Sequence, residues 1–350
     1  LLSFVAMKYI PALDGVRALA ILLVLVYHWF PEGQGINVMP NGPIGVTLFF
    51  VLSGYLISNI LMEQQTLGTF IRSFKNFVVR RALRIFPIYF LVLIGLLVLK
   101  RFSIVLNSDF YEHPLYYWSY LVNYWIELHG NWADALSPYW SLAVEEQFYL
   151  LWPLFMLLLS VRFRAYFLWY TVISGIVFRY FSIHVTGGQG VSMFACVDTF
   201  AWGALLAHYM RSGHAVVVGL WIKRLIVPVG FCFLMLCLKH SDADLVRQLF
   251  FRTFTAMVSV ALLFYAMQPG LWSRVLAVRP LRLIGQMSYG LYLYHMVVPD
   301  LFFQLASRMG ILIPVLPYNL VSVGVLGLSA YLSYRLIELP IQAFKRYFTA

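Results

Sequence analysis

The sequence predicts an all-α fold, a polytopic membrane bundle of about ten transmembrane helices with both termini in the cytoplasm. Hydrophobic residues make up 62% of the 350 residues and charged residues only 11%, and the mean hydropathy is +0.80. A chain of this composition cannot hide its apolar surface inside one aqueous core. Lipid must therefore solvate many of its side chains.

Apolar runs of suitable length occur along the whole chain, since about 20 residues of helix cross the hydrocarbon core of a bilayer. The ten predicted spans cover residues 13–30, 44–62, 82–99, 145–161, 165–182, 193–210, 225–238, 252–268, 283–303 and 318–335. Residues 115–128 are aromatic but contain polar side chains, so we expect them to form an interfacial segment.

Lys and Arg residues orient the spans. With a cytoplasmic N-terminus, most of the 25 Lys and Arg residues fall on inner segments, as the positive-inside rule requires. Counting residues 115–128 as a span would move most of the later cations to the outside, which is why we exclude it. The net charge of +11 therefore reflects membrane topology, and we expect no nucleic-acid partner.

We expect one membrane domain over residues 1–350 and no separate soluble domain, because no linker or low-complexity segment interrupts the spans. The longest segments between spans are a basic inner loop, 63–81, and an outer loop, 100–144. The outer loop is rich in Tyr and Trp, and its carboxylates are Asp109, Glu112, Glu127 and Asp134. This composition suits carbohydrate binding and an interfacial aromatic belt equally well.

The first span contains three polar side chains that we consider functional candidates. Arg17 and His28 are eleven residues apart, which on a helix is three turns plus about 20° and a rise of about 16 Å. They therefore share one helix face, and ionisable groups inside a span are functional candidates by default. Asp14 precedes Arg17 by three residues and can pair with it. The alternative is a snorkelling ion pair and a helix-end histidine that is hydrogen-bonded to the backbone.

Polar or small residues also mark the second and third spans. Ser53 and Gly54 in the second span permit either close helix packing or a local break, whose exposed N–H groups could stabilise an oxyanion. Arg81 and Arg84 share one face at the inner end of the third span. Such a pair suits phosphate groups, and the positive-inside rule explains it equally well.

Two later spans carry further candidates. Glu145 and Glu146 stand at the predicted outer start of the fourth span, where a carboxylate can orient a histidine or act as acid or base; we favour Glu145. Ser288, Tyr292 and His295 recur at helical spacing and should line one stripe of the ninth span. For His295, a polar anchor and a satisfied core histidine are equally plausible.

The sequence predicts no metal site, no disulfide and no bound cofactor. Its histidines show no HxxxH or HExxH spacing, and no glycine-rich phosphate loop occurs. The three cysteines lie in apolar segments and form no CxxC.

Six segments of the chain together resemble acyltransferase family 3, the membrane O-acyltransferases that modify bacterial surface polysaccharides and some natural products. In chain order they are YIPALDGVRALAILLVLVYH, FFVLSGYLI, RRALRIFP, WSLAVEEQFYLLWP, DTFAWGALLA and SYGLYLYH. They extend from about residue 8 to residue 340 with no departure from the family pattern. The chain resembles the stand-alone type, which lacks an additional extracytoplasmic hydrolase-like domain.

The resemblance implies a ten-helix enzyme of the bacterial inner membrane, an acyltransferase that transfers groups other than aminoacyl groups. It would move an acyl group, usually acetyl, from cytoplasmic acyl-CoA as co-substrate to a hydroxyl of a polysaccharide, lipopolysaccharide or exopolysaccharide precursor. His28, Arg17 and Glu145 would be catalytic, and Arg81 and Arg84 would bind acyl-CoA. The residues implied to line or support the site are Asp14, Phe49, Phe50, Ser53, Gly54, Tyr149 and His295.

Two mechanisms fit this reading: His28 acts as general base on the acceptor hydroxyl, or His28 itself carries the acyl group in a relay. Two other functions remain open. One is the acylation of a small-molecule glycoside such as a macrolide sugar. The other is a glycan or lipid transporter that uses the same intramembrane charges, although the sequence shows no inverted repeat.

Overall fold

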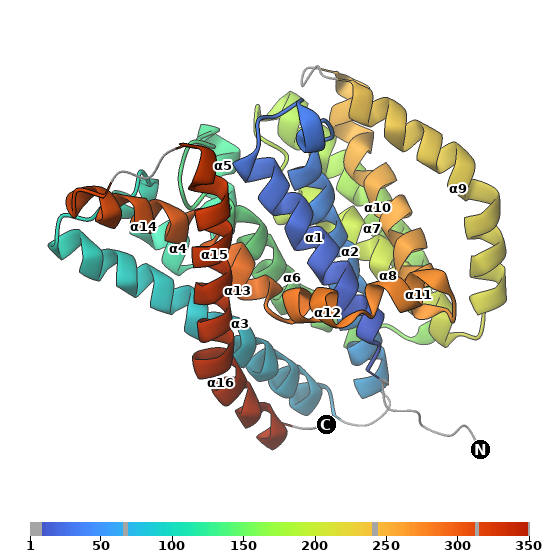
Figure 1. Cartoon of the computed structure of the whole chain (residues 1–350). Coiled ribbons are helices and arrows are strands. Elements are labelled where there is room, and N and C mark those ends of the chain that lie inside the picture. The colour runs from blue at the N-terminus through green and yellow to red at the C-terminus, as the bar shows by residue number, and fades with distance from the viewer. Residues whose placement is uncertain (1–8, 66–68, 240–243, 312–314, 349–350) are drawn as a thin grey trace. The chain divides into compact units, whose positions relative to one another are not determined.

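A computed structural model of the chain describes residues 9–65, 69–239, 244–311 and 315–348 (Figure 1). All regular structure within these ranges is helical, which confirms the all-α prediction for this part of the chain. Backbone N–H and C=O groups find no hydrogen-bond partner in lipid, so an apolar segment that enters a membrane must satisfy them internally, as a helix does.

The chain divides into two compact units, each assembled from segments that are distant in sequence. The first unit comprises Leu1–Leu67, Phe155–Ile176 and Val197–Gln286. The second unit comprises Gly68–Leu154, Val177–Cys196 and Met287–Ala350. That the whole chain acts as one membrane domain stays a prediction.

The first unit is built around helix α1. Its helices are α1 (Pro11–Trp29), α2 (Asn41–Gln64), the first part of α7 (Val161–Tyr180), most of α8 (Met193–Arg211), α9 (Ala215–Leu238), α10 (Leu245–Met267), α11 (Leu271–Leu276) and α12 (Arg279–Gln286). Helix α1 packs against α2 and α12, and α10 contacts both α2 and α9. Apolar residues of α1, α2 and α10 form the core, among them Val16, Leu52 and Leu263, each at most 2% exposed.

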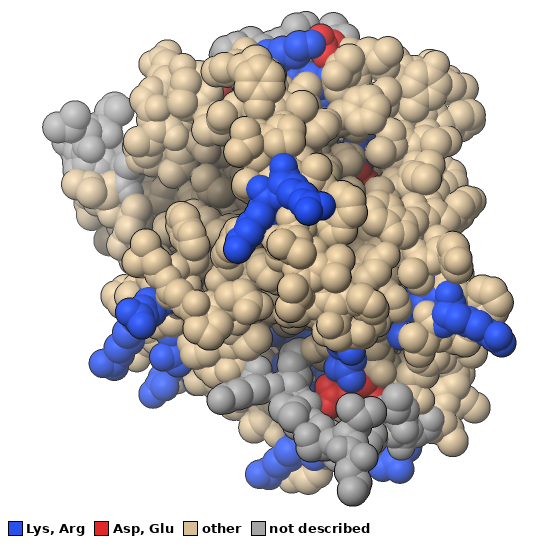
Figure 2. All heavy atoms as spheres, turned by 90° about the vertical axis from the view of Figure 1, so that its right-hand side faces the viewer, with Lys and Arg blue, Asp and Glu red and all other residues tan. Residues whose placement is uncertain are grey.

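Helices α9 and α10 are joined by a charged connection. Asp244 begins α10 because its side chain accepts a hydrogen bond from the backbone N–H of Arg247 at 2.8 Å. Lys239 also donates to this carboxylate at 2.7 Å, and the bond holds the pKa of Asp244 below its usual value. In the most apolar stretch of α9, only 11% of the residues are buried. The side of the molecule on which α9 lies is mostly uncharged, apart from a cluster of Lys or Arg side chains near its middle (Figure 2).

The second unit is built around the long helix α3. Its elements are α3 (Phe70–Arg101), α4 (Pro114–Trp118), α5 (Val122–His129), most of α6 (Tyr139–Leu158), α13 (Ser288–Tyr294), α14 (Val297–Arg308), α15 (Val315–Ser333) and α16 (Leu339–Ala343), with short helical turns η2 (Asp109–Tyr111), η3 (Phe181–Val185), η4 (Tyr334–Glu338) and η5 (Phe344–Tyr347). Helix α15 continues through η4 into α16, and η4, α16 and η5 all contact α3 (Figure 1).

Within the described residues, seven helices are long and apolar enough to cross a membrane. They are α1, α2, α3, α7 with η3, α9, α10 and the helix that runs from Leu320 to Tyr347. The count of ten spans and the orientation of the termini stay predictions. Residues 115–128 form the short helices α4 and α5, of five and eight residues, which are too short to cross a bilayer.

The predicted span at residues 283–303 is not one helix. This segment is divided among α12, α13 and α14, with breaks at Met287 and at His295–Met296. A continuous helix would place Pro299 in its interior, where the ring clashes with the carbonyl of residue 295 and no N–H can bond to it. Because α14 begins at Val297, Pro299 instead lies in a first turn, which tolerates proline.

Candidate active site

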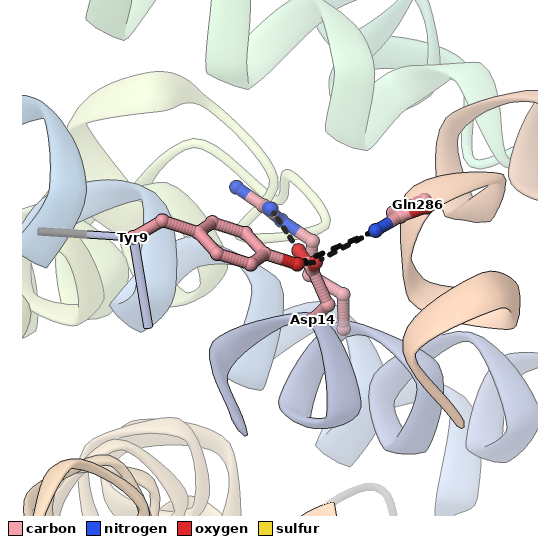
Figure 3. Close-up of polar contacts among 4 residues, drawn as sticks. Tyr9, Asp14 and Gln286 are labelled. Atoms are coloured by element: carbon pink, nitrogen blue, oxygen red, sulfur yellow. Dashed lines mark hydrogen bonds and ion pairs between the residues drawn. The ribbon is translucent and has the colours of Figure 1, made fainter. Parts of the chain in front are cut away.

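The Asp14 carboxylate is the centre of a polar cluster in the first unit. It lies in the first turn of α1 and is 4% exposed. Arg17 Nη1 approaches Asp14 Oδ1 at 3.1 Å, so the predicted ion pair is formed. The hydroxyl of Tyr9 donates to Oδ2, and Gln286 Nε2 donates to the same oxygen at 3.3 Å (Figure 3). Three partners from three segments therefore hold this carboxylate.

Two glycines allow the backbones around Asp14 to approach. A Cβ atom at Gly285, in α12, would lie 1.8 Å from the carbonyl oxygen of Asp14. A Cβ atom at Gly15 would lie 2.0 Å from the carbonyl oxygen of Leu276, in α11. Only glycine fits such contacts, and this closeness brings Gln286 to the carboxylate. The sequence analysis did not identify Tyr9 or Gln286. The pair Gly285–Gln286, a glycine beside a polar residue in an apolar region, is a signal that could have indicated Gln286.

His28 lies near the C-terminal end of α1, which is continuous from Pro11 to Trp29. Its Nδ1 is 2.9 Å from the carbonyl oxygen of Val24. A carbonyl only accepts, so Nδ1 carries the proton and Nε2 holds the lone pair of the neutral ring. This bond is the backbone contact expected of a structural histidine. It also fixes the tautomer with the proton on Nδ1, in which Nε2 can act as a general base.

The segment around Ser53 belongs to α2, which is unbroken from Asn41 to Gln64. The alternative of a local break with exposed N–H groups is therefore wrong, because helix packing keeps the backbone bonded. A Cβ atom at Gly54 would lie 2.1 Å from the carbonyl oxygen of Phe200, in α8. Phe50 stacks on the Phe200 ring at 4.6 Å, and Phe49 packs on the core of the first unit.

The predicted donor-binding residues lie in the second unit. The Arg81 guanidinium is 5.6 Å from the ring centres of both Phe77 and Tyr149. The Tyr149 hydroxyl donates to Glu145 Oε2 at 3.2 Å. Arg81, Tyr149 and Glu145, which the sequence placed on two different helices, are thus connected by side-chain contacts.

Glu145 and Glu146 do not stand at the start of a helix. Helix α6 begins at Tyr139, so both acids lie almost two turns inside it, because the buried residues before them, such as Ala143 and Val144, extend the helix. Glu146 is the more buried, at 7% exposed, and its Oε1 has no hydrogen-bond partner in the described part of the chain. The sequence could not separate two adjacent acids, since only tertiary packing decides which one turns inward.

The cationic cluster around Arg81 and Arg84 is larger than predicted. Lys345, in η5, lies within electrostatic range of Arg80, Arg81 and Arg84. Glu338, 4% exposed, faces Arg84 and Lys345. Lys345 follows the last predicted span, and the contact between η5 and α3 that brings it there has no signature in the sequence.

The candidates near residue 290 do not form one stripe of a long helix. Ser288 and Tyr292 lie in α13, whereas His295 lies just after its end. The Tyr292 hydroxyl donates to the carbonyl of Pro138 at 3.0 Å and lies 2.6 Å from Ser141 Oγ. His295 is 1% exposed, with Nδ1 2.6 Å from the carbonyl oxygen of Tyr292.

Comparison with known proteins assigns the chain to a family. The family model described as an acyltransferase domain, acyltransferase family 3, matches residues 10–334. The chain belongs to this acyltransferase family. Peptidoglycan O-acetyltransferase OatA of Listeria monocytogenes is 29% identical to it, over 96% of this chain and 56% of that protein. O-acetyltransferase OatA of Staphylococcus aureus is 30% identical, over 96% of this chain and 57% of that protein.

The chain spans about half the length of these curated relatives. No solved structure matches it. Family membership confirms the expectation of an acyltransferase for groups other than aminoacyl groups. Lys345 and Glu338 lie outside residues 10–334, which the acyltransferase model matches.

The segment 100–144 of this acyltransferase uses three of its four carboxylates in hydrogen bonds within the chain. Asp109 accepts from Trp125 and Asn131, and Asp134 accepts from the backbone N–H groups of residues 109 and 136. Glu127 accepts from the backbone N–H of Val191 at 2.6 Å. These three acids hold the segment together. Within the described residues, no cluster of three or more His, Cys, Asp or Glu side chains could hold a metal ion.

Proposed function

We propose that this chain is a multi-pass enzyme of the bacterial inner membrane that transfers an acetyl group from cytoplasmic acetyl-CoA to a hydroxyl of a cell-surface glycan. The observation that carries the proposal is a histidine and an ion-paired arginine on one helix, Arg17 and His28 of α1, within a chain of the acyltransferase family. Two relatives are named O-acetyltransferases, and one of these names specifies peptidoglycan.

The donor assignment rests on the cationic cluster of the second unit. Coenzyme A carries several phosphate groups, and Arg guanidinium groups bind phosphate through paired hydrogen bonds. Arg81, Arg84 and Lys345 place three basic side chains close together. With the N-terminus in the cytoplasm, this cluster lies on the side where acyl-CoA is made. Acyl-CoA is thus a co-substrate and not a bound cofactor.

The chemistry assigned to His28 is general-base catalysis. Its Nε2 accepts the proton of the acceptor hydroxyl while the hydroxyl oxygen bonds to the acetyl carbonyl carbon. The thioester C–S bond then breaks and coenzyme A leaves as the thiolate. Glu145, in the second unit, is proposed as a further catalytic acid. In the relay alternative, Nε2 itself attacks the thioester, and the acetyl group passes from His28 to the acceptor.

Membranes that contain the chain should transfer label from radiolabelled acetyl-CoA to a glycan. The double substitution Arg81→Gln and Arg84→Gln should raise the KM for acetyl-CoA by about 10- to 100-fold, because hydrogen bonds to charged groups contribute about 1.5–3 kcal/mol. Arg162→Gln, which changes an exposed arginine, is the matched control and should leave the KM unchanged.

An unchanged KM in the double variant would refute the donor assignment. Label in a small glycoside instead of a polymer would identify the small-molecule alternative. No uptake of label by a folded chain would contradict the proposed acetyl-CoA chemistry and favour the transporter.

Asp14→Asn should lower the transfer rate by about 10-fold with little loss of protein from the membrane. The amide keeps the size of the carboxylate but weakens the ion pair that orients Arg17, and a hydrogen bond to a charged group contributes about 1.5–3 kcal/mol. Initial rates at saturating acetyl-CoA measure the effect. Asp244→Asn, which keeps a helix-capping side chain, should retain the full rate. Equal rates in both variants would show that Asp14 does not position Arg17.

A further inference from the structure

The first unit contains a large apolar cavity away from the Asp14 cluster. Its volume is about 520 Å³ and its walls come from α7, α8, α9 and α10. Three tryptophans line it, Trp169, Trp202 and Trp221, together with aliphatic side chains. The volume falls within the roughly 300–1,000 Å³ of ligand sites, and the wall chemistry suits a hydrocarbon.

The cavity is a long groove along one face of α9. The residues of α9 that line it recur every three or four positions from His214, through Trp221 and Leu225, to Val229. This is the spacing of a single helix face, and fifteen residues of helix rise about 22 Å. The groove therefore matches a narrow, extended ligand such as one acyl chain. Most of the side of the molecule that carries α9 is uncharged, with one cluster of Lys or Arg side chains near its middle (Figure 2), and the uncharged part is open to lipid.

Basic residues lie near one end of the groove. His214 lines this end and is the N-cap residue of α9, without a capping side-chain bond. The first N–H groups of α9 therefore lack helical partners and attract an anion. His208 lies near both His214 and Arg164. Arg164 in turn lies near Arg211. The acid of this group is Glu63, 4.0 Å from Arg211, so positive charge prevails.

A buried donor lies in the wall of the groove. Trp202 Nε1 is buried and has no hydrogen-bond partner within the described residues. An indole N–H can only donate, and buried donors are nearly always paired. An acceptor oxygen on a ligand in the groove, such as an ester carbonyl, would satisfy it.

We propose that this groove binds one acyl chain of an anionic glycerophospholipid, with the phosphate at the N-terminus of α9 beside His214 and an ester oxygen accepting from Trp202. The apolar wall takes the chain, the cationic end selects the headgroup, and the unpaired indole selects an ester. This lipid site is independent of the proposed acetyl transfer.

Native mass spectrometry of the whole purified chain tests the proposal with two probes, dioleoyl phosphatidylglycerol and dioleoyl phosphatidylcholine. The wild type should bind phosphatidylglycerol about 10-fold more tightly, a difference of about 1.4 kcal/mol. Leu225→Trp fills the middle of the groove from a side chain that is 40% exposed, and should weaken phosphatidylglycerol binding about 10-fold. Val227→Trp is the matched control, because Val227 lies on the same helix, is 75% exposed and does not line the groove.

His214→Gln should remove the preference for phosphatidylglycerol while some binding of both lipids remains. If Leu225→Trp does not fold, Ala261→Phe fills the groove from α10 instead. Equal binding of both lipids by the wild type, equal effects of Leu225→Trp and Val227→Trp, or a dimer in place of the lipid-bound chain would each overturn the proposal.

Discussion

Replacing His28 with glutamine should lower acetyl transfer by about 10²- to 10⁴-fold, the usual contribution of a general base. Glutamine keeps a polar side chain of similar reach but cannot accept a proton at neutral pH or carry an acetyl group. Because Nδ1 is bonded to the carbonyl of Val24, the nitrogen that the substitution removes from the reaction is Nε2. Initial rates of label transfer from acetyl-CoA in membranes, normalised to protein content, measure the effect.

The matched control is His184→Gln, an exposed histidine in the second unit, which should keep the wild-type rate. Brief labelling followed by rapid denaturation separates the two mechanisms. In the relay, label appears on the wild-type protein and is absent from His28→Gln, whereas direct transfer labels the protein in neither. Full activity of both His28→Gln and His28→Ala would rule out the base and the relay together.

Gly54→Ala should destabilise the chain by about 3 kcal/mol, at the upper end of the cost of overpacking a core. The added Cβ would lie 2.1 Å from the carbonyl oxygen of Phe200, and a backbone atom inside a helix cannot move aside alone. Helices α2 and α8 would have to separate, which breaks the stacking of Phe50 on Phe200. Thermal unfolding in detergent, followed by size-exclusion chromatography, measures the loss.

Gly230→Ala in α9 is the matched control, because nothing lies within 4 Å of its added Cβ. Alanine in a helix is favoured over glycine by roughly 0.5–1 kcal/mol, so this variant should be as stable as the wild type or more so. Gly203→Ala, which meets the carbonyl of Val51 at 2.0 Å, should repeat the effect of Gly54→Ala. Equal stability of Gly54→Ala and Gly230→Ala would show that the helices separate at no cost.

Much of the helical architecture could be predicted because lipid constrains the backbone strongly. An apolar run in a membrane must bond its N–H and C=O groups internally, so hydropathy locates helices well. The prediction of one continuous helix failed at residues 283–303, where the hydropathy stays high but the helix breaks at Met287 and again at His295–Met296, shortly before Pro299. Proline bears only on the second break, and helices α3, α6 and α9 continue through interior prolines.

The predicted site also contains contacts that the sequence can predict and contacts that it cannot. The common face of Arg17 and His28 and the pairing of Asp14 with Arg17 follow from helical spacing alone, since residues eleven positions apart share one helix face and residues three positions apart are neighbours on it. The contacts of Arg81 with Tyr149 and of Gln286 with Asp14 join segments that are far apart in the chain. No periodicity encodes such contacts.

The sequence therefore specified most of the helices, their apolar character, the family and the pairing of Asp14 with Arg17, because composition and short-range spacing carry this information. Tertiary packing alone decided that Glu146 is more buried than Glu145, that Lys345 joins the arginine cluster and that α9 encloses an apolar groove. The physical reason is that burial and electrostatic proximity depend on which helices pack together, and that choice rests on close contacts such as the one at Gly54.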